Sequence, residues 1–267
     1  MSRTVVMQDG RLRSDGRVSI SADDPGLLHG RTCFETLRVR GGRIVELDAH
    51  LDRLKQSAAW MGIPLVSSQQ LAFELMALLS ELGEPEAVLR VMATPGGTRI
   101  LRGELAPPRR DQASVVALSW EPPQWLPGWI KHGSRAGSHH AKGDADEAIF
   151  VDSNGLVGEG TWSNVVAVIE GTLRTAPADG RILAGVTRME VLRAARFNGV
   201  PTVEQRFNLL DSIAEFYLCS TTHGLVPIVC CDARRFGGWG PVGRALDQTM
   251  HQAWGVPWPE PSFPPQQ

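Results

Sequence analysis

The most informative residue of this chain is an acid held between two glycines. Glu159 lies between Gly158 and Gly160, shortly before an apolar run over 165–169 that predicts a strand. A carboxylate beside apolar sequence loses hydration, and this cost is offset only where its charge is used. The segment therefore indicates an acid that serves a charged partner, with an ordinary polar turn as the alternative interpretation.

Lysine is scarce, because the chain contains only Lys55, Lys131 and Lys142. Lys55 falls off the apolar face of a helix expected over 48–62, and Lys142 precedes a loop, so both are expected on the surface. Lys131 lies upstream of Glu159. A lysine that forms a Schiff base and an acid that holds a cofactor nitrogen are the groups that pyridoxal phosphate chemistry needs most. The pair suggests such a site, although a solvated lysine is the default for Lys131 alone.

Three weaker signals suit a phosphate. Arg53 could clamp it through two hydrogen bonds, or could form an ion pair with a neighbour on its helix. Val186 and Thr187 open a helix expected over 188–197, where backbone N–H groups bind anions, although Thr187 could simply cap that helix. The hydroxyls of Ser220 and Thr221 follow at the end of a strand, where they could contact a phosphate or simply form a polar turn. Their order along one chain favours a single cofactor site.

Composition limits the class of protein. The 267 residues carry a net charge of −2 with 42% hydrophobic and 21% charged residues, typical of a soluble globular protein. We expect no nucleic-acid partner and no membrane partner, because the sequence has no basic field, signal-like start or bilayer-length apolar run. The four cysteines show no metal-ligand spacing, so we expect a cytoplasmic protein and no metal site. Metal binding by His132, His139 and His140 is disfavoured, because adjacent histidines point in different directions.

The pattern predicts two domains that position these groups. We expect a small N-terminal α+β domain over 1–120, a proline-rich linker over 121–130 and a larger domain over 131–256. The tail over 257–267 is proline-rich and expected to be extended or disordered. Residues 137–140 make a poor helix. The remaining helices are expected over 48–62, 68–82, 188–197 and 245–254, and strands over 88–93, 114–120, 148–152, 165–169, 172–175, 214–219 and 226–230.

Taken together, the motifs resemble the fold type IV pyridoxal phosphate enzymes, the family of branched-chain and D-amino-acid aminotransferases and aminodeoxychorismate lyase. The resemblance runs in family order from about residue 23 to 245. The Glu-Gly-x-x-Ser-Asn piece with the upstream His-x-x-Arg-Leu is its most specific pair. The matching segments are 29–38, 50–54, 146–148, 157–164, 185–188, 220–221 and 226–227.

The resemblance implies an α+β fold with a small N-terminal α/β sandwich and a larger C-terminal β-barrel-like domain with helices. It implies a homodimer acting on a small-molecule amino substrate, with the active site between the domains near the dimer interface. Pyridoxal 5'-phosphate would be bound covalently by Lys131, which also moves protons, and Glu159 would pair with its pyridine nitrogen. Arg53, Val186, Thr187, Ser220 and Thr221 would hold its phosphate.

The substrate carboxylate requires another cation, because Ala93-Thr94 stands where many relatives carry an Arg-Gly pair. The candidate substrate-binding residues are His29, Arg38 and Arg90, and Arg99 is a further possibility. Within the family, the compact length and Thr36 resemble aminodeoxychorismate lyase, whereas branched-chain aminotransferases typically carry glycine there.

We therefore expect a lyase that releases pyruvate and forms p-aminobenzoate for folate biosynthesis, with Lys131 and Thr36 as catalytic residues. A branched-chain or D-amino-acid aminotransferase is the alternative. A non-catalytic relative of the fold is the second alternative, and the joint retention of Arg53, Glu159 and residues 185–187 argues against it.

Overall fold

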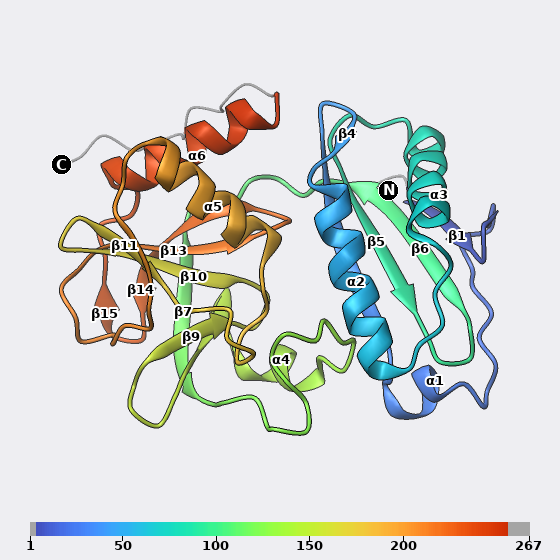
Figure 1. Cartoon of the computed structure of the whole chain (residues 1–267), viewed down its shortest axis with the longest axis horizontal. Helices are drawn as coiled ribbons and strands as arrows, with labels where there is room; N and C mark the ends of the chain where they lie inside the picture. The colour runs from blue at the N-terminus through green and yellow to red at the C-terminus, as the bar shows by residue number, and fades with distance from the viewer. Residues whose placement is uncertain (1–3, 256–267) are drawn as a thin grey trace. The chain divides into compact units, whose positions relative to one another are not determined.

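The structure is a computed structural model that describes residues 4–255 (Figure 1). The tail expected over 257–267 lies outside the described residues. The chain divides into two units, Met1–Pro107 with Gly128–Ala136, and Pro108–Pro127 with Gly137–Gln267. No helix among the described residues is long and apolar enough to cross a membrane.

The first unit is a sandwich of helices on an antiparallel sheet. Its strands are β1 (Thr4–Gln8), β2 (Arg11–Leu12), β3 (Cys33–Arg40), β4 (Arg43–Ile44), β5 (Ala87–Ala93) and β6 (Arg99–Leu105), in the order β2-β1-β6-β5-β3-β4. Helices α2 (Leu47–Met61) and α3 (Ser68–Leu82) cover one face, and the short α1 (Pro25–His29) precedes β3.

The alternation of apolar side chains between the two faces of the strands explains this arrangement. Leu37, Leu89 and Leu101 are fully buried against the apolar stripes of α2 and α3, while alternate residues point to the opposite face. The predicted helix start at Asp48 is wrong by one residue, because α2 begins at Leu47 with Glu46 as its N-cap.

Residues 131–133 run beside the start of β3, and they belong to the first unit. His132 forms a β-bridge with Cys33, and the Gly133 N–H donates to the Thr32 carbonyl at 2.8 Å. The segment carrying Lys131 is therefore fixed along the start of β3.

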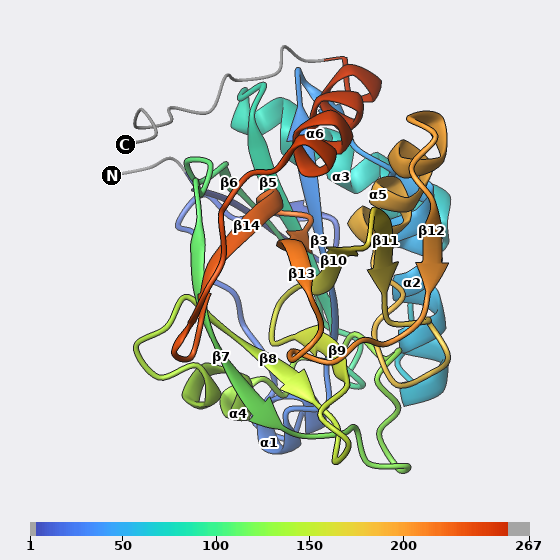
Figure 2. The same cartoon turned by 90° about the vertical axis from the view of Figure 1, so that its left-hand side faces the viewer.

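The second unit contains a closed ring of strands. Its strands are β7 (Ala113–Ser119), β8 (Glu147–Val151), β9 (Val157–Gly160), β10 (Asn164–Ile169), β11 (Thr172–Thr175), β12 (Thr202–Glu204), β13 (Ile213–Ser220), β14 (Gly224–Cys231) and β15 (Arg234–Arg235). The order β10-β13-β14-β7-β8-β9 closes because β9 pairs again with β10 (Figure 2). The predicted barrel-like domain is thus confirmed.

The two faces of strand β10 pack into two different cores. Val165 and Ala167 face the barrel interior, whereas Val166 and Val168 face a second core with α5 (Val186–Phe197) and α6 (Pro241–Ala253). Because both faces are buried, the strand is apolar throughout.

Two expectations about helices are wrong. Residues 137–140 were expected to be a poor helix, yet they lie in the six-residue helix α4 (Ala136–Ala141), where a single turn tolerates one glycine. Helix α6 begins four residues before the expected Ala245, because Pro241 suits the first turn of a helix, where its missing N–H has no partner to lose.

Candidate active site

Lys131 is held by its backbone and its side chain. Its N–H donates to the buried Ser57 hydroxyl at 3.0 Å, and its carbonyl accepts from the Phe34 N–H at 3.1 Å. The half-buried Nζ lies 4.8 Å from the centre of the Phe34 ring. By contrast, the Lys142 ammonium donates to the carbonyls of its own loop, Gly143 at 3.3 Å and Ala145 at 3.0 Å. The structure therefore distinguishes Lys131, whose backbone and side chain are both held in place, from Lys142, whose ammonium closes its own turn.

A buried acid, Glu35, binds the predicted phosphate ligand Arg53. The Arg53 Nε and Nη2 atoms donate to the two Glu35 oxygens at 2.7 and 2.8 Å, and His50 Nδ1 lies 2.8 Å from Glu35 Oε2. Glu35 is on β3, so the alternative for Arg53, an ion pair with a neighbour on its own helix, is not the pair that the structure shows. His50, Arg53 and Ser57 share the buried face of α2 at helical spacing, and Ser57 joins this cluster to Lys131.

The charge of Glu35 is strongly stabilised. Burial alone would raise the pKa of this carboxyl, but the Arg53 guanidinium and the hydrogen bonds from Arg53 and His50 lower it to about 2. Burial lowers the pKa of His50, and Glu35 only partly opposes this effect. Lys131 also lies close enough to lower the pKa of Glu35. These residues form a cation-rich cluster around one carboxylate.

Sequence reasoning missed Glu35. The sequence does contain an indication of it. Glu35 stands at an inward-facing position of the strand over 33–39, and a buried carboxylate needs a charged or hydrogen-bonding partner.

The other face of the same sheet carries the candidate substrate residues. Thr36 on β3 is opposite Arg90 on β5, which is opposite Arg102 on β6. Arg90 is exposed, and no ion pair involves it among residues 4–255. Arg38 is instead buried and paired with Glu86 at 3.0 Å.

The other candidate substrate-binding residues differ from Arg90 in their contacts. Burial and the neighbouring Arg40 lower the pKa of Arg38 to about 10. Arg99 forms two hydrogen bonds with Glu74 of α3, at 2.8 and 2.7 Å. His29 is exposed at the end of α1. Arg90 is thus the most exposed of the three candidate arginines.

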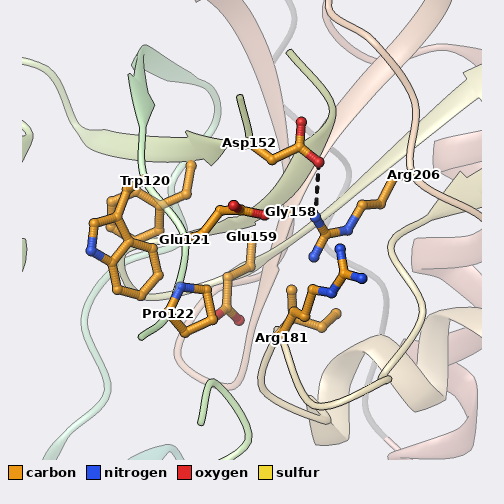
Figure 3. A pocket seen from close by; sticks show the side chains of 10 residues that line it. Trp120, Glu121, Pro122, Asp152, Gly158, Glu159, Arg181 and Arg206 are labelled. Carbon is orange, nitrogen blue, oxygen red and sulfur yellow. Dashed lines mark hydrogen bonds and ion pairs between the residues drawn. The ribbon is translucent and has the colours of Figure 1, made fainter. Parts of the chain in front are cut away.

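Glu159 stands at one rim of the barrel, at the end of β9. Its Oε2 accepts from the Leu183 N–H at 3.0 Å and from Asn164 Nδ2 at 3.4 Å, and Asn164 Nδ2 also donates to the Leu183 carbonyl at 2.9 Å. Figure 3 shows Glu159 at a pocket lined by Trp120, Pro122 and Arg181. Asn164, which the sequence analysis did not assign, links the acid to the backbone of Leu183, just before α5.

The start of α5 carries backbone donors that no side chain caps. Its N-cap is Gly185 and not Thr187, and no side chain caps the first turn, so the backbone N–H groups of Val186 and Thr187 remain for a ligand. A Cβ at Gly185 would overlap Asn164 Oδ1, so the close approach requires glycine.

Strand register brings the hydroxyl candidates to the same rim. Asn164 is opposite Glu159 on one side and Cys219 on the other. Ser220 and Thr221 directly follow Cys219, and the Ser220 hydroxyl accepts from the His223 N–H at 3.4 Å. The second unit therefore gathers Glu159, Val186, Thr187, Ser220 and Thr221, and the first unit gathers Lys131 and Arg53.

Known proteins share this architecture. A hypothetical aminotransferase from Mycobacterium tuberculosis in its PLP-bound form has a TM-score of 0.84 and 27% identity, covering 94% of this chain and 98% of that one. A branched-chain aminotransferase from Thermoproteus uzoniensis shares the fold, with a TM-score of 0.85 at 21% identity over 96% of each chain. D-alanine aminotransferase of Bacillus licheniformis is 29% identical, over 88% of this chain and 91% of that protein.

The fold defines a class, the fold type IV enzymes that use pyridoxal phosphate. The family model for amino-transferase class IV matches residues 32–231, and the chain belongs to this family. The expected family, fold and pyridoxal phosphate cofactor are thereby confirmed, and the chain is an enzyme of the class IV aminotransferase family.

Proposed function

We propose that this protein is an amino acid aminotransferase, the alternative of the sequence analysis, and not the lyase that Thr36 suggested. The relatives that support this proposal are named as aminotransferases, including one for D-alanine. Thr36 is a single residue, and its structural neighbour Arg90 suits the carboxylate of any amino or keto acid. The observation that supports cofactor chemistry is the oriented Lys131 amine beside the Glu35–Arg53 pair, and the named relatives favour the transferase over the lyase.

The described residues fit pyridoxal phosphate. An uncapped helix start with glycine at its N-cap suits a phosphate, a half-buried acid at the barrel rim suits a pyridine nitrogen, and an oriented amine suits covalent attachment. When bound, the cofactor supplies a ring that accepts electrons from the substrate α-carbon.

Each residue then has a role in the proposed mechanism. Lys131 would bind the cofactor covalently and carry a proton at Nζ between the substrate α-carbon and the cofactor. Glu159 would hold the pyridine nitrogen, and Leu183 and Asn164 would keep its carboxylate in place. Arg53 with the N–H groups of Val186 and Thr187 would bind the phosphate.

Substrate orientation is the remaining task. Arg90 would bind a substrate carboxylate, and because its guanidinium is exposed it can do so without breaking an internal ion pair. Ser220 and Thr221 would add hydrogen bonds to the phosphate. Holding both ends of the substrate–cofactor pair supplies the orientation on which such transfers depend.

We also propose a homodimer. The sheet face that carries Thr36 and Arg90 also exposes Met92, at 38% of its surface. Sedimentation at micromolar concentration tests this, with a mass of twice 29.1 kDa as the expected result and a monomer as the contradicting one.

A transferase needs a keto acid to accept the amino group, whereas a lyase needs no acceptor, and this difference separates the two activities. With holoenzyme and D-alanine or a branched-chain amino acid, the visible band of the cofactor should convert to that of its amine form, and a keto acid should restore it. Aminodeoxychorismate should give no pyruvate in the absence of an amino acceptor. Rapid pyruvate release from aminodeoxychorismate with no amino transfer would overturn the proposal in favour of the lyase.

A further inference from the structure

A second buried acid lies behind the loop that follows Glu159. Glu147 on β8 is 5% exposed. Its Oε1 atom accepts from the Trp162 N–H at 2.7 Å, the Ser163 N–H at 2.9 Å and the Ser163 hydroxyl at 2.8 Å. One oxygen thus accepts hydrogen bonds from two consecutive backbone N–H groups of the tight loop.

The loop that Glu147 fills joins the two strands of the candidate site. It connects Glu159 on β9 to Asn164 on β10, and it closes with a hydrogen bond from the Gly160 N–H to the Ser163 carbonyl at 2.8 Å. A Cβ at Gly160 would overlap Glu147 Oε1, so the carboxylate occupies the space a side chain would need. The conformation of the loop therefore depends on this oxygen.

From the loop, a continuous set of contacts reaches the start of α5. Glu159 and Asn164 both hydrogen-bond the backbone of Leu183, and Asn164 packs against Gly185. Helix α5 begins at the next residue. A shift of the loop would move the pyridine-binding acid relative to the phosphate-binding N–H groups.

We propose that Glu147 is a positioning residue: by filling the loop over 160–163 it sets the place of the Glu159 carboxylate and, through Asn164, of the start of α5. This inference rests on the proposed cofactor roles of Glu159 and α5. Glu147 would act through the loop and through the two residues that it positions.

The role requires an acceptor oxygen and not a charge. Burial raises the pKa of Glu147, and the hydrogen bonds from Trp162 and Ser163 oppose this only in part. All three donors also converge on one oxygen, which an amide carbonyl can replace. Glu147→Gln should therefore preserve the loop, whereas Glu147→Ala removes the acceptor on which the three hydrogen bonds converge.

Glu215 provides a matched control. It is likewise 5% exposed and accepts from two backbone N–H groups, Val242 at 3.0 Å and Gly243 at 2.8 Å, and from the Tyr217 hydroxyl at 2.7 Å. These bonds hold the start of α6 and do not involve the loop over 160–163. Glu215→Ala thus reports the general cost of deleting such an acid.

The test measures two properties of the cofactor and one of the protein. For each variant we would determine the dissociation constant of pyridoxal phosphate, the pH midpoint of the visible band of the lysine-bound cofactor, and the melting temperature of the apoprotein. Glu147→Ala should weaken cofactor binding about tenfold and move the pH midpoint in the same direction as Glu159→Gln. Glu147→Gln should stay within about twofold of the wild type, and Glu215→Ala should lower the melting temperature without moving the midpoint.

Failure of the inference and failure of the proposed function are distinguishable. If Glu159→Gln moves the midpoint but Glu147→Ala changes only the melting temperature, Glu147 is structural and the inference is wrong. If Glu159→Gln changes neither cofactor property, the assigned role of Glu159 falls, and the inference falls with it. Should Glu147→Ala not fold, Ser163→Ala removes one of the three hydrogen bonds and must move the midpoint in the same direction, or the inference is overturned.

Discussion

Replacing Glu35 by glutamine removes the charge on which the buried cluster of the first unit depends. Glu35 is fully buried between Arg53 and His50, and its pKa falls from the usual 4.5 to about 2. Because one pKa unit corresponds to about 1.4 kcal/mol, the folded protein gains about 3 kcal/mol at neutral pH by keeping this carboxyl ionised. Glu35→Gln also leaves Arg53 buried without its counter-charge, so we expect a destabilisation of about 3 kcal/mol.

The sign of the pH effect follows from the lowered pKa. The stabilisation is complete above the unfolded value and is lost as the pH falls from about 5 toward 2. Urea denaturation of the apoprotein, followed by circular dichroism at several pH values, should therefore show a steeper loss of stability in the wild type than in Glu35→Gln. A difference below about 1 kcal/mol at pH 7, or the same pH dependence in both proteins, would refute the reasoning.

Three further predictions concern single sites. Gly185→Ala should weaken pyridoxal phosphate binding about tenfold in a titration of the apoprotein, because the new Cβ overlaps Asn164 Oδ1; unchanged affinity would contradict the close approach. Arg90→Ala should raise the KM for the keto acid about tenfold in steady-state kinetics with little change in kcat, and an unchanged KM would contradict carboxylate binding. Iodoacetamide should label the native protein at the half-exposed Cys230, since burial raises the pKa of the other three thiols to about 12, and mass spectrometry should find those three unmodified.

Local patterns in the sequence predicted elements of the second unit. The run over 165–169 and the helix expected over 188–197 each follow from neighbouring residues, and they are present as β10 and α5. Glu159 could be singled out for the same reason, because its glycine flanks and the apolar strand are contiguous in the chain.

What the sequence could not predict depends on contacts between distant residues. Glu35 meets Arg53 across 18 positions, and Glu147 meets Ser163 across 16, so neither pairing is visible as a spacing in one element. Likewise, Arg38 and Arg90 are equivalent as sequence, and the structure separates them because Arg38 is buried and paired with Glu86 whereas Arg90 is exposed. Tertiary packing, and not local propensity, decides which charges are already used.

The central claim is that Lys131 carries the cofactor, and borohydride trapping tests it most directly. Reduction of the holoenzyme fixes the pyridoxyl group on the lysine that binds it, and peptide mapping by mass spectrometry then locates it. The account predicts the label on Lys131, with Lys142→Ala labelled equally well. A label on Lys142, or a holoenzyme of Lys131→Ala that still incorporates the pyridoxyl group, would contradict it.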